Sequence, residues 1–388
     1  MTRPVLVFDD TRLFGGHERM FLRLAPAIHD AFPGAPVALC VPARNDRLVA
    51  AIEAAGLAGA EVVRSPFAKG PGEPYRAPLR LGYRAFVRRL VHRLAPRLVI
   101  LVQGRIEAAL VPLIEAKAAG LRVMSYLPMA HPVAEIRGDT PLNRVLDRAR
   151  RPYYAAPDLF AVPTRTVEAQ LRRAQVRAPV HVVPNIVEGA ISASARPTAR
   201  RRLGLPADAR LALVMGRIDR AQKGLDDLVD RIAGFTRPGW IFVLVGDGPD
   251  SRWLDAELAR RELTGRVTRV GWTDVPQEYY RASDVVLLPS RFEGMPLVIL
   301  EALLHRRPVV ASPIEAHAEL LPPRALASFT EQHAFETAFL DAAHHGEEIH
   351  GALFRHAPRW RDIDHSRRLF RDALLQTLAE PAGDASQP

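Results

Sequence analysis

Short apolar runs alternate with amphipathic segments along most of this chain, and this alternation restricts the possible folds more than any other feature. A short run that is apolar throughout is typical of a strand buried on both faces, and helical segments between such runs predict a parallel sheet covered on both sides. In the first half of the chain, strands are predicted at residues 4–8, 37–41, 61–63, 98–102 and 122–127. Helices are predicted there at residues 18–31, 46–55, 76–95 and 107–119.

The same pattern returns in the second half of the chain. Residues 188–200 contain glycine, serine and proline without a clear period, which is typical of a linker. We therefore expect an α/β protein with two Rossmann-like, doubly wound domains that face each other across a cleft. Ligands bind beyond the carboxyl ends of the strands in such sheets. The second set of strands is predicted at residues 211–215, 241–245, 267–270, 285–288 and 308–311.

Charge and cysteine content narrow the classes of function. The chain has 388 residues, enough for two domains of ordinary size, and a formal net charge of +10. Arginine carries almost all of the positive charge, because the only lysines are Lys69, Lys117 and Lys223. The excess fits an anionic substrate or an anionic membrane surface, and no nucleic-acid-binding motif accompanies it. Cys40 is the only cysteine, which excludes an internal disulfide and a cysteine-based metal site.

We expect neither a secretory signal nor a membrane-spanning segment. The apolar core of the first ten residues is too short for a signal peptide, and no run approaches the roughly 20 apolar residues that span a bilayer. A helix over residues 83–94 mixes apolar and basic faces, so it is either an ordinary core helix or a contact with an anionic membrane. The expected location is the cytoplasm, with peripheral attachment at the inner face of the cell membrane as an addition.

The segment from Arg291 to Glu301 carries the most specific chemistry. It follows the apolar run at 285–288, turns at Glu293 and Gly294, and enters a helix at Pro296. A helix start offers free backbone N–H groups and a partial positive charge, which suit a phosphate. Glu293 in the turn and Glu301 inside the helix place a carboxylate on each side, where they can hold hydroxyl groups. A nucleotide-sugar, in which two polyols flank a diphosphate, matches this arrangement.

Three further strand ends carry residues of the same kind. Gly216 begins a loop that contains Arg217 and Lys223, two side chains that bind phosphate. Gly246 and Gly248 end the next strand and indicate a tight turn or the close approach of a backbone. Trp272 ends a further strand and is either a flank for a nucleobase or an ordinary edge aromatic.

The first half offers weaker candidates. Gly15 and Gly16 join a strand to a helix, where a diphosphate or sugar can approach, although a plain turn explains them as well. His131 follows the predicted strand at 122–127 and is either structural or part of the site.

Together and in this order, these motifs resemble those of glycosyltransferase family 4, whose members are retaining enzymes with two facing Rossmann-like domains, the GT-B fold. The resemblance covers about residues 5–375 and is strongest at 211–303. It implies that Glu301 holds the ribose hydroxyls and that Glu293 contacts the donor sugar. The backbone at Gly294, Met295, Pro296 and Leu297 would meet the sugar and phosphates.

The resemblance also implies roles for the charged groups. Arg217 and Lys223 would neutralise the diphosphate leaving group, Gly16 would let its loop approach the donor, and His131 would be the histidine near the sugar. Residues 1–187 would form the acceptor domain and residues 188–361 the nucleotide-sugar domain. A helix at about 362–380 would return to the first domain, and residues 381–388 would be a flexible tail.

The implied reaction transfers a sugar from a UDP- or GDP-linked donor, with retention, to a glycan or lipid-linked acceptor in bacterial polysaccharide or glycolipid synthesis. A front-face path is expected, in which the leaving diphosphate helps to deprotonate the acceptor hydroxyl. No metal is expected, because no Asp-x-Asp motif occurs at the relevant place. The alternatives are a non-catalytic protein that binds nucleotide-sugars or glycans, and a GT-B nucleotide-sugar epimerase.

Overall fold

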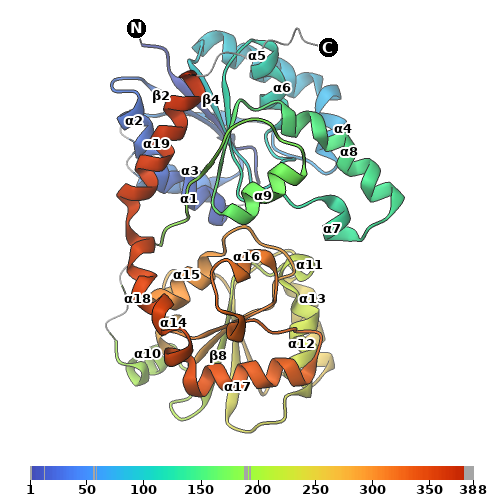
Figure 1. Cartoon of the computed structure of the whole chain (residues 1–388), viewed down its shortest axis with the longest axis vertical. Helices are drawn as coiled ribbons and strands as arrows, with labels where there is room; N and C mark the ends of the chain where they lie inside the picture. The colour runs from blue at the N-terminus through green and yellow to red at the C-terminus, as the bar shows by residue number, and fades with distance from the viewer. Residues whose placement is uncertain are drawn as a thin grey trace. The chain divides into compact units, whose positions relative to one another are not determined.

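The structure is a computed structural model that describes residues 2–12, 14–55, 57, 59–187, 191 and 194–379. The chain divides into two compact units. Unit 1 comprises residues 1–185 and 363–388, and unit 2 comprises residues 186–362. Both units are α/β structures in which every strand pair is parallel, so the predicted fold class is confirmed (Figure 1). The predicted domain boundary at residue 188 and the predicted tail at 381–388 lie outside the described residues.

Unit 1 contains a seven-stranded sheet in the order β3-β2-β1-β4-β5-β6-β7. Successive strands are added on one side of β1 up to β3 and on its other side from β4 onward, so the order reverses between β1 and β4. Such a switch point opens a crevice at the carboxyl ends of the two strands. The strands are Val5–Phe8 (β1), Val37–Pro42 (β2), Glu61–Ser65 (β3), Leu98–Val102 (β4), Val123–Tyr126 (β5), Leu159–Val162 (β6) and Val180–Val182 (β7).

The helices of unit 1 connect these strands, and the last helix of the described chain completes the unit. That helix, α19, packs against α2 and α1 (Figure 1). The helices are Gly16–Leu24 (α1), Pro26–Ala31 (α2), Asp46–Ala54 (α3), Glu73–Arg76 (α4), Leu81–Leu94 (α5), Leu110–Ala118 (α6), Val133–Arg137 (α7), Pro141–Ala155 (α8), Arg165–Arg173 (α9) and Ile363–Ala379 (α19).

Unit 2 contains a five-stranded sheet in the order β10-β9-β8-β11-β12. Its order reverses between β8 and β11, which places the switch point of this unit there. The strands are Arg210–Met215 (β8), Trp240–Val245 (β9), Val267–Val270 (β10), Val285–Leu288 (β11) and Val309–Ala311 (β12). The helices are Arg196–Arg202 (α10), Arg220–Lys223 (α11), Leu225–Gly234 (α12), Ser251–Arg260 (α13), Pro276–Ala282 (α14), Leu297–Leu304 (α15), Glu315–Ala318 (α16), Gln332–Ile349 (α17) and Gly351–His356 (α18).

Alternation along β8 shows why its sequence is apolar throughout. Successive side chains of a strand point to opposite faces of the sheet. Leu211 and Leu213 pack into one buried cluster with residues of α15, and Ala212 and Val214 pack into another with residues of α12 and α17. Both faces of this strand are therefore buried beneath helices.

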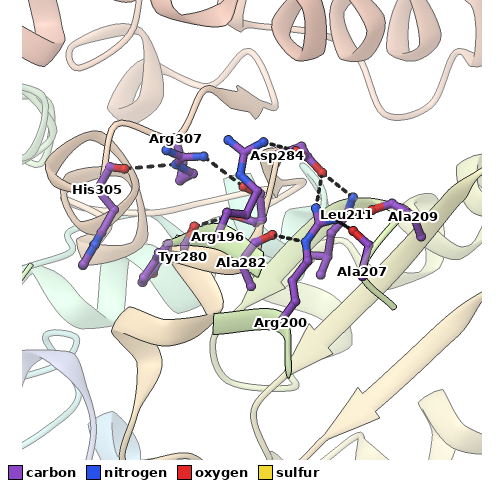
Figure 2. A network of polar contacts seen from close by, with 11 residues as sticks. Arg196, Arg200, Ala207, Ala209, Leu211, Tyr280, Ala282, Asp284, His305 and Arg307 are labelled. Carbon is purple, nitrogen blue, oxygen red and sulfur yellow. Dashed lines mark hydrogen bonds and ion pairs between the residues drawn. The ribbon is translucent and has the colours of Figure 1, made fainter. Parts of the chain in front are cut away.

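An arginine-rich network fastens the opposite edge of this sheet, where β8 and β11 begin (Figure 2). Asp284, which precedes β11, accepts hydrogen bonds from the Leu211 backbone at 2.7 Å and from Arg200 at 2.8 Å. Arg200 also donates to the carbonyl oxygen of Ala282 at 3.0 Å, and Arg196 of the same helix pairs with Asp284 at 2.7 Å. Part of the arginine content therefore serves the fold of unit 2.

Three local predictions need correction. The helix expected at 18–31 is two helices, because Pro26 lacks the N–H group that a continuous helix would need. The helix expected at 76–95 is α4, a short 3-10 segment and α5, with Pro78 in the break. The linker expected at 188–200 ends earlier than predicted, since α10 begins at Arg196, and residues 188–190, 192 and 193 lie outside the described residues.

Residues 128–187 were given no elements from the sequence, yet they contain two strands and three helices. The strands β6 and β7 are only four and three residues long, so their apolar runs are too short to stand out. In the described part of the chain, no helix combines the length and apolarity that crossing a bilayer requires.

Candidate functional site

The switch point of unit 2 holds a buried ion pair. Lys223 ends α11 in the loop after β8, and Glu293 lies in the turn after β11. The Lys223 Nζ atom lies 2.5 Å from the Glu293 Oε1 atom. Burial acts to raise the pKa of Glu293, but the charge and hydrogen bond of Lys223 outweigh burial and hold this pKa below its ordinary value. Both predicted residues therefore meet, and the carboxylate is ionised.

Glycines allow the neighbouring loops to approach one another closely. Gly246 has a φ of +135°, and a Cβ atom there would lie 1.9 Å from the carbonyl oxygen of Gly216. A Cβ atom on Gly248 would lie 2.1 Å from the carbonyl oxygen of Ile218. The Ile218 backbone in turn donates a hydrogen bond to the Asp247 carbonyl oxygen at 3.0 Å. The loops after β8 and β9 are therefore joined backbone to backbone, which leaves no space for a side chain at these positions.

Gln222 connects Arg217 to the loop after β11. Its side-chain oxygen accepts a hydrogen bond from Arg217 Nη2 at 2.9 Å, and its backbone oxygen accepts one from the Arg291 backbone at 2.8 Å. The Gln222 side chain is buried, whereas that of Arg217 is 48% exposed. Arg217 is therefore held at one end and can still be reached by a ligand. Sequence reasoning missed Gln222, although it directly precedes Lys223.

The helix predicted after Glu293 is α15, and its start is open. Gly294 and Met295 lead to Pro296, which is the N-cap residue and has an extended backbone, and Leu297 is the first helical residue. Among the described residues, no side chain caps this helix end. The first backbone N–H groups of the helix are thus available for an anion.

Glu301 lies one turn further along α15, and its carboxylate has the partner that its apolar surroundings require. The hydroxyl of Tyr280 donates a hydrogen bond to Glu301 Oε2 at 2.6 Å. The ring of His305 stacks on the ring of Tyr280, with centroids 5.5 Å apart and planes 8° from parallel. Tyr280, which the sequence did not indicate, therefore fixes this carboxylate.

Trp272 lies at the same edge of the sheet, after β10. Its side chain is largely exposed, and its backbone donates a hydrogen bond to the Asp247 side chain at 2.9 Å. The ring is therefore on the surface and not packed in the core, which leaves its predicted contact with a nucleobase open.

His317 is a second residue that sequence reasoning missed. It is completely buried, and its Nδ1 atom lies 2.8 Å from the carbonyl oxygen of Ser312, which makes Nδ1 the donor. Burial lowers the pKa of His317 to about 4, Lys223 adds to this effect, and Glu293 acts against it. The imidazole beside the ion pair is therefore neutral at neutral pH.

The remaining predicted residues lie in unit 1. Gly15 caps α1, Gly16 is its first residue, and the Gly15 backbone donates to Glu18 Oε2 at 2.8 Å. His131 follows β5, and its Nδ1 atom lies 2.8 Å from Glu135 Oε1. The Gln170 side chain lies 3.4 Å from both ring nitrogen atoms of His131.

One group in unit 1 has the residue types of a metal site. Asp9, His17 and Glu18 each offer a ligand atom, and these atoms lie within 4.8 Å of one another. The Thr11 hydroxyl lies 2.5 Å from Asp9 and 2.7 Å from Glu18, and it has one proton to donate. Burial, with the charge of Glu18 added, raises the pKa of Asp9 well above its ordinary value. A proton held by Asp9 accounts for the geometry.

The unit 2 edge thus combines a lysine, an arginine and a helix start within loops that are joined to one another. Such a set binds an anion of several oxygens, and the carboxylates of Glu293 and Glu301 accept hydroxyl groups beside it. Known proteins show the same combination of fold and sequence. Residues 209–344 match the family model described as glycosyl transferases group 1.

Two curated relatives and one solved structure illustrate the likeness. The alpha-D-kanosaminyltransferase of Streptomyces kanamyceticus is 33% identical over 159 residues, 40% of each chain. The lipopolysaccharide core biosynthesis mannosyltransferase LpsB of Rhizobium meliloti is 35% identical over 131 residues, 32% of this chain and 37% of its own. The crystal structure of Anabaena HepE with UDP and glucose is 20% identical, with a TM-score of 0.74 over 96% of this chain and 100% of that one.

These likenesses differ in reach. The matched segments of these two curated relatives span 37–40% of their own length, so the sequence likeness is local. The likeness to HepE covers both units, and at its low identity it concerns the fold. Residues 209–344 therefore carry the sequence of glycosyl transferases group 1, and the chain as a whole has the fold of a solved GT-B glycosyltransferase.

Proposed function

We propose that this chain is a retaining glycosyltransferase. It would move a sugar from a nucleotide-diphosphate sugar to a glycan or lipid-linked acceptor in bacterial polysaccharide or glycolipid synthesis. The observation that carries the proposal is the ion pair between Lys223 and Glu293 at the switch point of unit 2. The group 1 match to residues 209–344 and the UDP and glucose in the HepE structure support a nucleotide-sugar as the donor.

The diphosphate would bind at the start of α15. Lys223 has three N–H donors and directs one to Glu293, so two can serve phosphate oxygens. Arg217, anchored through Gln222, would add charge-assisted hydrogen bonds. Glu301, which accepts one hydrogen bond from Tyr280, retains lone pairs that can accept the ribose hydroxyls.

Catalysis would rest on charge that develops as the glycosyl bond breaks. The leaving diphosphate gains negative charge, and donors already in position stabilise it without reorganising. Glu293 would hold the donor sugar while keeping Lys223 oriented, and His131 would lie near the sugar, as the family resemblance implies. A front-face reaction, in which the diphosphate accepts the proton of the acceptor hydroxyl, would give retention and would need no metal. UDP- and GDP-linked sugars both remain candidates for the donor.

Release of nucleoside diphosphate from a panel of UDP- and GDP-hexoses, with and without cell-derived glycolipid acceptors, tests the proposal. We expect one donor to be hydrolysed slowly alone and faster with acceptor. Lys223→Ala should abolish this activity. Lys117→Ala is the matched control, since Lys117 pairs with Asp158 at 2.8 Å where β5 and β6 begin, at the edge opposite the ligand edge of its sheet. Donor binding without release of diphosphate would instead indicate a non-catalytic binding protein, and inversion or epimerisation of the released sugar would contradict retention.

A further inference from the structure

The switch point of unit 1 contains a lysine without a counter-ion. Lys69 lies in the loop after β3, and its backbone donates a hydrogen bond to the Asp10 carbonyl oxygen at 2.7 Å, just beyond β1. The Lys69 ammonium makes no hydrogen bond and no ion pair with any residue that the structure describes. An ammonium that is removed from water without a partner is unfavourable, so this position needs an explanation.

Two arginines lie close to this ammonium. Arg105 follows β4, the strand on the other side of the switch point, and Arg150 comes from α8. Burial lowers the pKa of Lys69; the charge of Asp10 acts against this effect, and the charges of Arg105 and Arg150 add to it. Burial also lowers the pKa of Arg150, and Arg105 adds to that effect as well. The three cations are therefore near enough to repel one another.

The nearby carboxylates are mostly engaged elsewhere. Glu73 pairs with Arg80 at 2.7 Å and accepts a hydrogen bond from the Gly70 backbone at 3.0 Å. Glu107 pairs with Arg150, and Asp147, 3.5 Å from Arg150, caps the start of α7. That leaves Asp10 to face Lys69.

Asp10 only partly balances the cations. It is buried, and its side chain accepts a hydrogen bond from the Ala109 backbone at 2.8 Å. Burial raises the pKa of Asp10 to about 6. One carboxylate thus faces the charges of Lys69 and Arg105.

We propose that Lys69, Arg105 and Arg150 form a phosphate-binding subsite at the switch point of unit 1, and that this subsite receives a phosphate group of the acceptor. All three side chains are partly exposed, so a ligand can reach them. They come from three separate elements, which suits the three oxygens of a phosphate monoester better than the two of a carboxylate. The role as an acceptor subsite rests on the proposed function, whereas the binding of phosphate does not.

Titration of the full chain with inorganic phosphate, against chloride at equal ionic strength, tests the subsite by calorimetry and thermal shift. We expect wild type to bind phosphate and Lys69→Met to bind it at least about tenfold more weakly, since one hydrogen bond to a charged group is lost. Arg89→Ala, which removes an exposed arginine of α5, should leave phosphate binding unchanged. Equal phosphate binding by wild type and Lys69→Met, or no binding by either, would overturn the proposal.

Stability separates this role from a structural one. If Lys69 awaits a ligand, Lys69→Met should melt at the same temperature as wild type or higher when phosphate is absent. A clear fall in the melting temperature of ligand-free Lys69→Met would show that the ammonium serves the fold, and would also overturn the subsite.

Two further arms identify the source of the phosphate and isolate the proposed function. Co-sedimentation with vesicles of phosphatidylcholine containing phosphatidic acid that is lost in Lys69→Met indicates a lipid-borne group, and phosphate binding without such co-sedimentation indicates a soluble one; both support the subsite. Vesicle binding that Lys69→Met retains, with no effect on free phosphate, contradicts it. UDP binding is measured in the same samples. Its absence argues against the proposed function alone, and its presence without phosphate binding argues against the subsite alone.

Discussion

The two units have a lysine at the same place in their topology and treat it differently. Lys223 in unit 2 lies at the switch point between β8 and β11 and contacts a buried glutamate at 2.5 Å. Lys69 in unit 1 lies at the switch point between β1 and β4, and among the described residues it has no ionic partner. One positive charge is fixed before any ligand arrives, and the other is left with two arginines beside it.

The difference indicates two ways of binding an anion. A paired lysine is oriented in advance, which is what stabilisation of developing charge requires. An unpaired lysine gains its counter-ion from the ligand, so binding removes an unfavourable charge as well as forming contacts. The first arrangement suits a reaction, and the second suits recognition of a charged group that takes no part in it.

The largest expected effect comes from breaking the ion pair in unit 2. Lys223→Ala should lower turnover by about 10²–10³-fold, the loss typical of one donor to developing negative charge. It should also lower the free energy of unfolding by roughly 3 kcal/mol, because Glu293 is left buried and unpaired. Steady-state kinetics and urea unfolding measure the two losses.

A double variant distinguishes these two effects of Lys223→Ala. Lys223→Ala with Glu293→Gln should regain most of the stability, since no buried charge remains, and none of the turnover. Recovery of turnover in the double variant would show that the lysine acts only through the fold.

The next effect concerns pH and unit 1. The pKa of Asp10 is about 6 in the folded state against an ordinary 3.8, so between these values the unfolded state binds fewer protons than the folded state. The free energy of unfolding should therefore fall as pH rises from about 4 to 6, by on the order of 3 kcal/mol from this group. Asp10→Asn keeps an oxygen for the Ala109 N–H group and should flatten that part of the profile. Parallel profiles for wild type and Asp10→Asn would contradict the assignment.

A smaller effect tests whether the unit 2 edge is rigid. Gly248→Ala should cost about 2 kcal/mol of stability, because the added methyl group would overlap the Ile218 carbonyl oxygen and push the two loops apart. Chemical denaturation gives the value, and the affinity for UDP should fall with it. Gly265→Ala is the matched control, since a Cβ atom there has no neighbour within 4 Å in the described structure. Equal costs for both substitutions would mean that the loops are not tightly joined.

The smallest expected effect comes from the second carboxylate of unit 2. Tyr280→Phe removes the hydroxyl that lies 2.6 Å from Glu301 and should cost about 1 kcal/mol. If Tyr280 orients Glu301 for the ribose, UDP affinity should weaken several-fold in calorimetry while phosphate binding at unit 1 stays constant. A drop in phosphate binding instead would blur the distinction between the two edges.

Much of the fold was predictable from local pattern. Strands such as Leu98–Val102 and Val285–Leu288 were predicted at the bounds that they have, because buried parallel strands are apolar throughout. Glycines at strand ends were equally visible, and the structure gives their reason at Gly246 and Gly248, where backbone atoms occupy the place of a side chain. Short strands at the sheet margin, such as Val180–Val182, were not predictable, since three residues carry too little pattern.

The candidate site divides in the same way. Lys223, Arg217, Glu293 and Glu301 were candidates from the sequence because each follows a predicted strand end or helix start. Which partner each one has was decided by tertiary structure alone, as Tyr280 on Glu301 shows.

Sequence by itself determined the order of strands and helices, two parallel sheets, and which residue types stand at the strand ends. Those properties depend on neighbours in the chain. Tertiary structure decided which lysine is paired and which is not, because an ion pair depends on distances between segments that are remote in sequence. Lys69 and Lys223 look alike as letters, and only the packed chain places a carboxylate in contact with one and arginines near the other.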